Sequence, residues 1–163
     1  MSSAFLSRLA GRARRSLGTA EISQRLDEIE ARLAEIKAQH YPNGPLYFGN
    51  DTALVATRWG AKMLVSTEDI AISPWLALDG LWEAQVTAWM EANLRSGQVF
   101  VDVGANVGYF TLLGAKLVGG EGHVVAVEAH PRLAELLRRN VVINGHHGYT
   151  TVYERAAWSS TTS

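Results

Sequence analysis

The feature that most constrains this chain is an apolar strand followed at once by a turn that contains two glycines. Residues 99–103 read VFVDV, the turn reads GANVG, and an apolar helical run begins at Tyr109. A second apolar run, residues 124–127, follows and ends in Glu128. Parallel strands need a crossover connection, which is usually a helix. The order therefore predicts a parallel βαβ unit whose turn lies at the carboxyl end of the first strand.

The alternation of strands and helices continues toward the C-terminus. We expect the first helix over residues 109–117 and a second helix from Pro131, which suits a first helical turn, to about Ile143. A third strand is expected over residues 151–154. Strands that alternate with helices predict one parallel sheet with right-handed crossovers. The predicted fold class is α/β and Rossmann-like.

The region before this unit is expected to hold a β-hairpin and a helix. Residues 53–66 form two apolar runs around an Arg-Trp-Gly turn, which predicts the hairpin. Pro74 is expected to interrupt regular structure, and residues 81–94 are expected to be helical. One stripe of this helix is expected to be core, as is usual for tryptophans at helical spacing: Trp82, Val86 and Trp89.

The N-terminal residues separate into two parts. Residues 1–19 contain four arginines and no acid, and we expect a basic tail, because the arginines interrupt the apolar core that a signal peptide needs; a basic helix on a membrane surface is the alternative. Residues 20–40 are predicted to form an amphipathic helix. Its apolar residues recur at spacings of four and three, the pattern of a coiled-coil seam: Ile22, Leu26, Ile29, Leu33 and Ile36. Either residues 22–36 join two copies as a homodimer, or the helix lies on its own domain or serves as a link.

A Pro-Asn-Gly-Pro break at 42–45 separates this helix from the rest of the chain. We expect one domain over residues 46–163. Its first part, 46–96, holds the hairpin and helix, and its second part, 98–158, holds the alternating strands and helices.

Composition excludes several classes of protein. The chain has 163 residues, a formal net charge of −1 and no cysteine. Disulfides and thiolate metal sites are therefore excluded, and no global positive field points to nucleic acid. No apolar run reaches the roughly 18 residues that span a bilayer. We accordingly expect a cytoplasmic protein with no nucleic-acid partner, no bound metal and no transmembrane segment.

The residues of the turn narrow the class of ligand. A dinucleotide site would have the pattern G-x-G-x-x-G and a P-loop would have a lysine, whereas this turn has Gly104, Asn106 and Gly108. Asp102 precedes the turn, and its carboxylate would repel a pyrophosphate. It favours a ligand that is positively charged and lacks phosphate, such as S-adenosylmethionine. Gly104 would let the backbone approach that ligand closely.

Glu128 stands at the end of the second strand, where an acidic residue can accept hydrogen bonds from both hydroxyls of a ribose. The carboxyl ends of adjacent parallel strands meet at one edge of a sheet, so Glu128, Asp102 and the turn are expected to lie together. Two structural alternatives remain open. Asp102 could serve as a cap or turn carboxylate, and Glu128 could be a surface acid that caps the helix starting at Pro131.

Residues 102–111, DVGANVGYFT, resemble motif I of the class I methyltransferases that use S-adenosylmethionine, and more narrowly the FkbM family. The resemblance covers roughly residues 46–159. It implies a Rossmann-like class I methyltransferase fold. The supporting stretches are LDGLWE (78–83), VEAHPR (127–132), the segment 140–145 and RAAWS (155–159).

The resemblance also implies roles at the cofactor. Asp102, Gly104 and Asn106 would line the methionine end of S-adenosylmethionine, and Glu128 would hold its ribose. Glu83 would reach its amino acid group. The remaining implied contacts come from the turn and from segments beside the adenine: Ala105, Gly108, Ala129 and Ala156.

The implied reaction is transfer of a methyl group to a hydroxyl oxygen of a small molecule or sugar, with the enzyme chiefly positioning the reactants. Family members continue to a seven-stranded sheet. We therefore expect this chain to be an N-terminal portion, truncated after about the third strand and inactive as a transferase on its own. None of the five histidines is identified as a general base, and the catalytic residues remain unknown.

Two other interpretations remain open. One is an NAD-binding oxidoreductase domain, which Asp102 and the missing G-x-G-x-x-G pattern disfavour. The other is a non-catalytic dimerising module that keeps a relic half of the Rossmann-like fold.

Overall fold

The computed structural model describes residues 21–29, 31, 32, 35 and 44–156, and the chain separates into two compact units, 1–42 and 43–163. In the first unit every described residue is helical and exposed. The exposed side chains include those of Ile22, Leu26 and Ile29. The predicted basic tail, residues 1–19, lies outside the described residues, as do Leu33 and Ile36 of the predicted seam.

The second unit begins with an antiparallel sheet of three strands in the order β1-β2-β3. They are β1 (Leu46–Gly49), β2 (Thr52–Ala56) and β3 (Lys62–Ser66). β2 and β3 confirm the predicted hairpin, and β1 is an addition to it. Asn50 and Asp51 join β1 to β2 with positive φ angles of 48° and 54°. Both residue types tolerate this left-handed region, and two such residues in succession make a type I′ hairpin turn.

Two helices follow, α2 (Ser73–Asp79) and α3 (Ala84–Asn93). The expected interruption at Pro74 is wrong. This proline occupies the first turn of α2, where its missing N–H costs nothing because the first N–H groups of a helix have no partner within it.

The predicted buried stripe on α3 is also wrong in part. Trp89 is 61% exposed and Val86 is exposed as well, whereas Trp82 packs against the core. The inward positions of α3 are Thr87 and Met90. Thr87 is held there because its hydroxyl donates to the carbonyl oxygen of Trp82 at 2.8 Å. This polar contact, which apolar periodicity does not reveal, sets the face of the helix that is buried.

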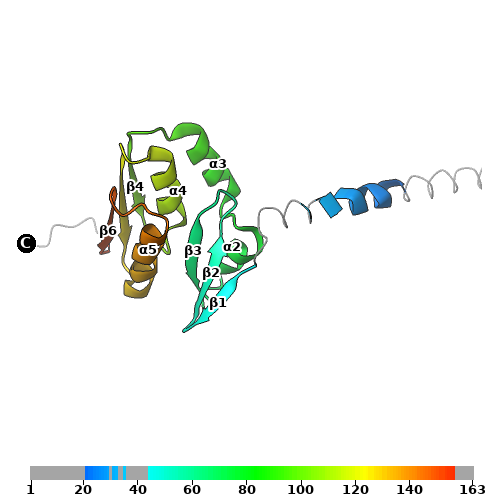
Figure 1. Cartoon of the computed structure of the whole chain (residues 1–163), viewed down its shortest axis with the longest axis horizontal. Helices are drawn as coiled ribbons and strands as arrows, with labels where there is room; N and C mark the ends of the chain where they lie inside the picture. The colour runs from blue at the N-terminus through cyan, green and yellow to red at the C-terminus, as the bar shows by residue number, and fades with distance from the viewer. Residues whose placement is uncertain (1–20, 30, 33–34, 36–43, 157–163) are drawn as a thin grey trace, which may run out of the picture. The chain divides into compact units, whose positions relative to one another are not determined.

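The C-terminal part confirms the predicted alternation (Figure 1). Its three strands are parallel and lie in the order β4-β5-β6. The elements are β4 (Val99–Val103), α4 (Tyr109–Val118), β5 (His123–Glu128), α5 (Pro131–Ile143) and β6 (Thr150–Glu154).

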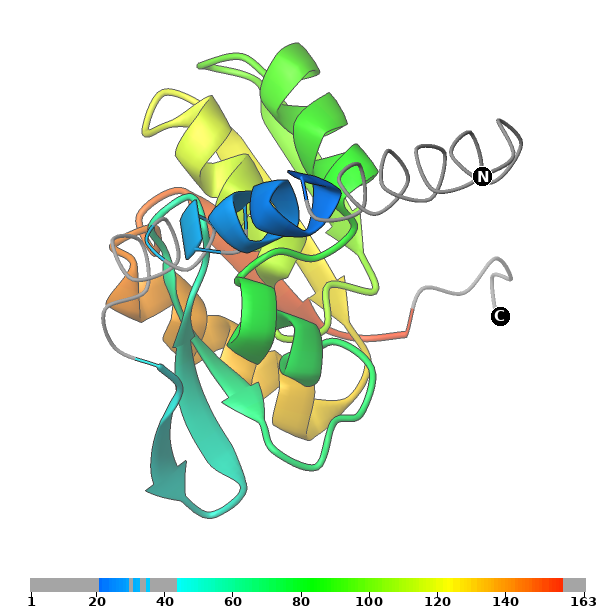
Figure 2. The ribbon, with the colours of Figure 1, turned by 90° about the vertical axis from the view of Figure 1, so that its right-hand side faces the viewer.

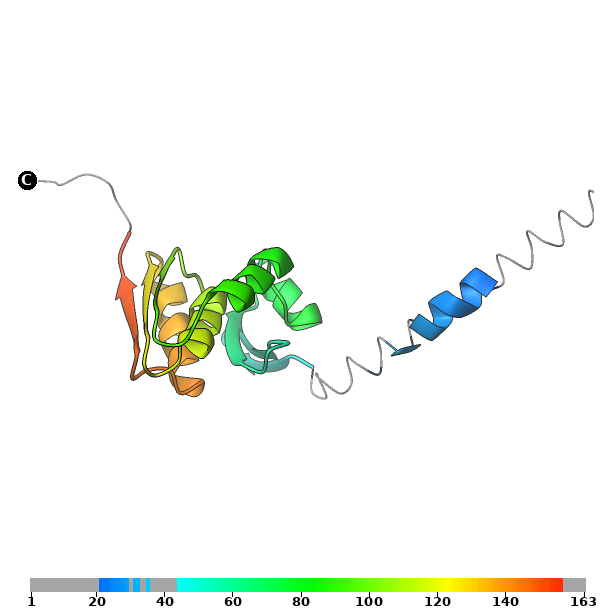
Figure 3. The same ribbon diagram turned by 90° about the horizontal axis from the view of Figure 1, so that it is seen from above.

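Helices α4 and α5 lie between the two sheets (Figures 1 and 3). α4 packs on β4 and β5, and α5 packs on β5 and β6 on one side and on β3 on the other. Figure 2 shows α3 beside α4. Most of the buried apolar side chains form one core, which includes Met63, Val65, Leu76, Leu112 and Leu137. A smaller second cluster of Ala115, Val118 and Val124 lies between α4 and the parallel sheet.

Asn140 of α5 and Asn144, which caps the C-terminus of this helix, join α5 to the free edge of β3. Asn140 is fully buried; its side-chain oxygen accepts the N–H of Leu64 at 2.6 Å, and its amide donates to the carbonyl oxygens of Leu64 (2.9 Å) and Val107 (2.8 Å). Asn144 makes the corresponding pair of bonds with Lys62, at 3.0 and 2.7 Å. The two side chains thus satisfy edge groups that an unpaired strand would leave open.

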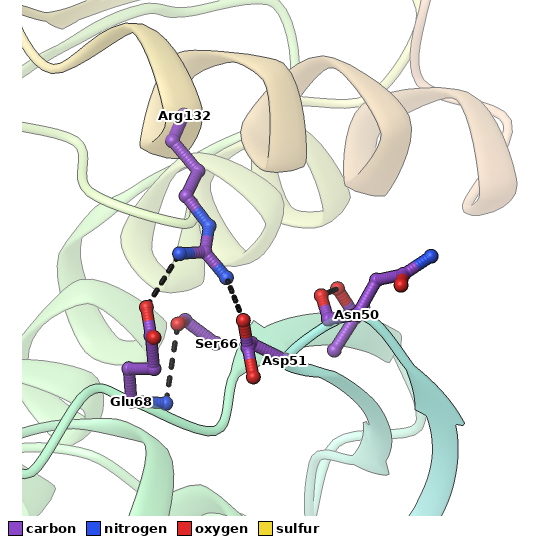
Figure 4. Close-up of polar contacts among 6 residues, drawn as sticks. Asn50, Asp51, Ser66, Glu68 and Arg132 are labelled. Atoms are coloured by element: carbon purple, nitrogen blue, oxygen red, sulfur yellow. Dashed lines mark hydrogen bonds and ion pairs between the residues drawn. The ribbon is translucent and has the colours of Figure 1, made fainter.

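Arg132 provides a second link between α5 and the antiparallel sheet (Figure 4). Its guanidinium contacts the carboxylates of Glu68 and, at 3.5 Å, Asp51. All three side chains are substantially exposed, so each pair is worth only about 0–1 kcal/mol. The buried asparagine bonds, rather than these ion pairs, are therefore the stronger attachment of α5.

The opposite face of the parallel sheet is not covered by any element within residues 44–156. Val99, Val101 and Val103 are 67%, 55% and 62% exposed. Phe100 and Asp102 alternate with them and lie on the helical side, because successive side chains of a strand point to opposite faces.

We predict that Asp69→Ala lowers the free energy of unfolding by about 1–3 kcal/mol, because the carboxylate of Asp69 accepts the N–H groups of Ala71, Ile72 and Ser73 at the start of α2. Burial raises the pKa of Asp69, but these bonds outweigh it and hold the pKa below its ordinary value. The contribution is therefore present above the ordinary pKa and lost as the pH falls through the lowered one. Urea unfolding at neutral and acidic pH measures it, with Asp69→Asn as the control that keeps an acceptor. Equal loss at both pH values would contradict the prediction.

Candidate functional site

The turn between β4 and α4 is held in a left-handed conformation at three positions. Gly104, Asn106 and Gly108 have φ angles of 79°, 52° and 95°. The N–H groups of Gly104 and Ala105 both donate to the carbonyl oxygen of Val127, at 2.8 and 3.0 Å. The turn is therefore fastened to the end of β5, where the sequence predicts it to lie.

Glu128 is 8% exposed, and both of its carboxylate oxygens are engaged. One accepts the N–H of Asn106 at 2.7 Å, and the other accepts the N–H of His130 at 2.8 Å. Glu128 is therefore not a surface acid, although its bond to His130 does lie at the start of α5, where the capping alternative placed it. The carboxylate fixes the turn and the entry to α5, and each oxygen keeps a second lone pair for another donor.

Asp102 lies on the helical side of β4 and accepts a hydrogen bond from the Thr111 hydroxyl at 2.5 Å. Burial raises the pKa of Asp102, the hydrogen bond opposes this, and the negative charge of Glu128 adds to the rise. Two carboxylates therefore share one edge of the sheet, and the free chain holds Asp102 in surroundings that disfavour its charge. Thr111 was missed as a site residue, although it lies within the quoted motif.

The two glycines of the turn differ in their surroundings. A Cβ at Gly104 would meet nothing within 4 Å, whereas a Cβ at Gly108 would lie 2.3 Å from Cδ1 of Leu137. Gly108 and Ala105 are buried, and Ala105 belongs to the apolar core. The structure thus gives Gly108 and Ala105 packing roles and leaves open space at Gly104.

The other residues predicted to contact the cofactor are Ala129, Ala156 and Glu83. Ala129 and Ala156 are exposed, one after β5 and one after β6. The two strand ends are adjacent, because the N–H of Arg155 donates to the carbonyl oxygen of Glu128 at 3.0 Å. Glu83 is exposed at the start of α3 with φ 42°. Its side chain makes no bond to the turn among the described residues, so its approach to a cofactor remains a prediction.

The described histidines do not form a catalytic constellation. His146 bonds to the Tyr149 hydroxyl at 2.6 Å and His123 bonds to Thr151 at 3.0 Å. Burial lowers the pKa of His146. Within the described ranges, no group of three or more His, Cys, Asp or Glu could hold a metal, and none of the helices is long and apolar enough to cross a membrane.

Comparison with known proteins identifies the segment that carries this site. Residues 102–163 match the family model of the methyltransferase FkbM domain. This segment belongs to the FkbM family. The FkbM segment begins at Asp102 and contains the turn and Glu128, so the residues that meet at the sheet edge lie within it.

Two curated methyltransferases are similar in sequence to part of this chain. A protein-L-isoaspartate O-methyltransferase of Ignicoccus hospitalis is 39% identical over 61 residues, which are 37% of this chain and 29% of that protein. A protein-L-isoaspartate O-methyltransferase of Methanothrix thermoacetophila is 45% identical over 49 residues, 30% of this chain and 23% of that protein. The matches thus span less than a third of the length of these relatives.

A solved structure resembles a longer part of the chain. TYW2 of Pyrococcus horikoshii, solved in complex with MeSAdo, superposes with a TM-score of 0.50 at 19% identity, over 81% of this chain and 50% of that one. The likeness confirms the predicted α/β, Rossmann-like fold.

Proposed function

We propose that the turn at residues 104–108 binds S-adenosylmethionine and that the protein is a methyltransferase. The observation that carries this proposal is Asp102, a carboxylate at the edge of the sheet whose surroundings disfavour its charge. A cationic ligand would stabilise that charge, whereas a pyrophosphate would be repelled. The membership of residues 102–163 in the FkbM family supports the same cofactor.

The residues present fit this cofactor. The open space at Gly104 would let the ligand approach the backbone. The free lone pairs of Glu128 could accept the ribose hydroxyls while the same carboxylate keeps its bonds to Asn106 and His130. Ala129 and Ala156, both small and exposed, would leave room for an adenine beside the ends of β5 and β6.

The bound cofactor would supply an activated methyl group on a sulfonium. The protein's own residues would act by binding and orientation: Asp102 would hold positive charge, and Glu128 would fix both the ribose and the turn. We propose an oxygen as the acceptor, because the family resemblance implies a hydroxyl of a small molecule or sugar. The names of the relatives also specify O-methylation, there with protein L-isoaspartate.

Calorimetric titration of the chain with S-adenosylmethionine, S-adenosylhomocysteine and NAD tests the cofactor. We expect both adenosyl ligands to bind and NAD not to bind, since NAD carries a pyrophosphate. Binding of NAD alone would replace the proposal with the oxidoreductase interpretation. Absence of binding by all three would support the non-catalytic module.

The glycines of the turn supply a matched pair of variants. Gly104→Ala and Gly108→Ala share the strain of a positive φ, about 1–2 kcal/mol. Only Gly108→Ala also crowds Leu137, which is fully buried and cannot move aside freely. We predict that Gly108→Ala is less stable than Gly104→Ala by about 1–3 kcal/mol, measured by urea unfolding. Gly104→Ala should instead weaken S-adenosylmethionine binding. Equal stability of the two variants would refute the packing role of Gly108.

We also propose that residues 22–36 join copies of the chain. Ile22, Leu26 and Ile29 are exposed on one helix, and exposed apolar residues at this spacing favour helix association. We predict that the full chain sediments as an oligomer and that Leu26→Asp with Ile29→Asp converts it to a monomer. Gln24→Asp with Ala31→Asp, both exposed and off the seam, is the control that adds the same charge. A monomeric unmodified chain would refute this proposal.

A further inference from the structure

We propose that a groove between the antiparallel sheet and the end of α5 binds a small amphiphilic anion, a molecule with an apolar body and one negatively charged group. The groove has a volume of about 470 Å³, within the range of about 300–1,000 Å³ that is usual for small-molecule sites. Its lining includes apolar side chains from both elements and two cations: Phe48, Leu54, Leu64, Ile143, Lys62 and Arg139.

The charge of the lining selects the charge of the ligand. Lys62 and Arg139 both line the groove, and no acidic residue does. Within the described part of the chain neither cation is in an ion pair. Arg138, which lines an adjoining hollow, is instead paired with Glu154 at 3.0 Å. Two unpaired cations beside an apolar surface complement an anion that carries an apolar chain.

Part of the apolar lining is exposed in the free chain, although Leu64 is buried. Phe48 is 58% exposed and Ile143 is 45% exposed, although both stand beside cavity-lining Leu54 and Leu64. Exposed apolar side chains that gather around a hollow mark ligand grooves more often than scattered ones do. The apolar body of the ligand would therefore cover side chains that the fold leaves in contact with water.

The walls of the groove are held in place without a ligand. Asn140 and Asn144 bind the backbone of Leu64 and Lys62 through four hydrogen bonds of 2.6–3.0 Å. These bonds fix the end of α5 against β3, so the gap between them is preformed. A preformed site loses less entropy when it binds than one that must be assembled.

The groove is separate from the proposed cofactor site. That site lies where β5 enters α5 at Pro131, whereas the residues of α5 that line the groove, Arg139 and Ile143, lie in the second half of the helix, and no residue of the proposed cofactor site lines the groove. A rise of 1.5 Å per residue places Pro131 and Ile143 about 18 Å apart. The two sites also select opposite charges, so this inference stands independently of the proposed function.

Titration of the full chain with octanoate, followed by NMR of the methyl groups, tests the inference. We expect saturable shifts at the methyl groups of Leu54, Leu64 and Ile143. Octyl phosphate in a parallel arm shows whether the site prefers a carboxylate or a phosphate head. Octylammonium, with the same chain and the opposite charge, should not bind there, and acetate, with the head and no chain, should bind at least tenfold more weakly.

Charge reversal supplies the second half of the test. Lys62→Glu with Arg139→Glu should weaken octanoate binding about tenfold or more. Arg25→Glu with Arg95→Glu, which changes the net charge equally outside the groove, should leave it unchanged. Both pairs are exposed, and circular dichroism verifies that each variant is folded. Equal binding of octylammonium, unchanged binding after charge reversal, or shifts confined to Val99, Val101 and Val103 would each overturn the inference.

Discussion

Asn140→Leu should lower the free energy of unfolding by about 3–5 kcal/mol, the largest effect expected from any single side chain of α5. Asn140 is fully buried and makes three hydrogen bonds to the backbone of Leu64 and Val107. Leucine is similar in size but would leave one donor and two acceptors without partners. Each buried polar group that lacks a hydrogen-bond partner costs about 1–3 kcal/mol. The total should be less than the sum for the three groups, because the surrounding structure can shift to satisfy some of them.

Urea unfolding followed by circular dichroism measures this loss. Asn144→Leu is the matched control, since Asn144 makes the equivalent pair of bonds to Lys62 from a partly exposed position. Water can replace those bonds, so we expect a loss of only about 1 kcal/mol. If the two variants lose equal stability, burial is not what makes the Asn140 bonds costly to remove.

Asp102→Asn should weaken S-adenosylmethionine binding about 10- to 100-fold while making the ligand-free chain more stable at neutral pH. Burial raises the pKa of Asp102, with the charge of Glu128 adding to the rise. A carboxyl whose pKa is raised on folding stabilises the fold fully below its ordinary pKa, and this contribution is lost as the pH rises through the raised value. Asparagine does not ionise, so the variant keeps this stability at neutral pH. Its amide oxygen can still accept the hydrogen bond from Thr111.

Calorimetry and urea unfolding of the same two proteins check both halves of this prediction. Binding should fall because the neutral amide cannot offset the positive charge of the ligand, and the difference in stability between the two proteins should shrink as the pH is lowered toward the ordinary pKa. S-adenosylhomocysteine, which lacks the sulfonium charge, should lose less affinity than S-adenosylmethionine. A variant that is less stable at neutral pH yet binds normally would show that Asp102 serves the fold and not the ligand.

Local signals in the sequence accounted for most of the secondary structure. The runs at 99–103 and 124–127, with the glycine turn between them, predict β4, β5 and the edge at which Asp102 and Glu128 meet. These predictions hold because apolar periodicity, turn glycines and a proline at a helix start act over a few residues. The prediction at Pro74 was wrong, because a proline is compatible both with an interruption of regular structure and with the first turn of a helix.

The same signals could not show which partners the side chains take. The sequence did not show that the two carboxylate oxygens of Glu128 hold Asn106 and His130, while its expected role toward a ribose stays a prediction. Trp89 was expected in the core, yet Thr87 faces inward because it bonds to residues outside its own helix, Trp82 and Tyr109. The contacts of Glu128 with Asn106 and of Thr87 with Tyr109 each join positions 22 residues apart, which apolar periodicity does not bring together.

The parallel βαβαβ unit, the position of its turn and the acidic residues at the strand ends follow from the amino-acid sequence, because each depends on short-range backbone preferences and on the alternation of apolar residues. The attachment of α5 depends instead on the packing of the whole domain. Asn140 and Leu64 are 76 positions apart, and their hydrogen bonds exist because packing brings an antiparallel sheet against a helix of the parallel unit. The same packing forms the groove with its unpaired cations, which no local pattern records.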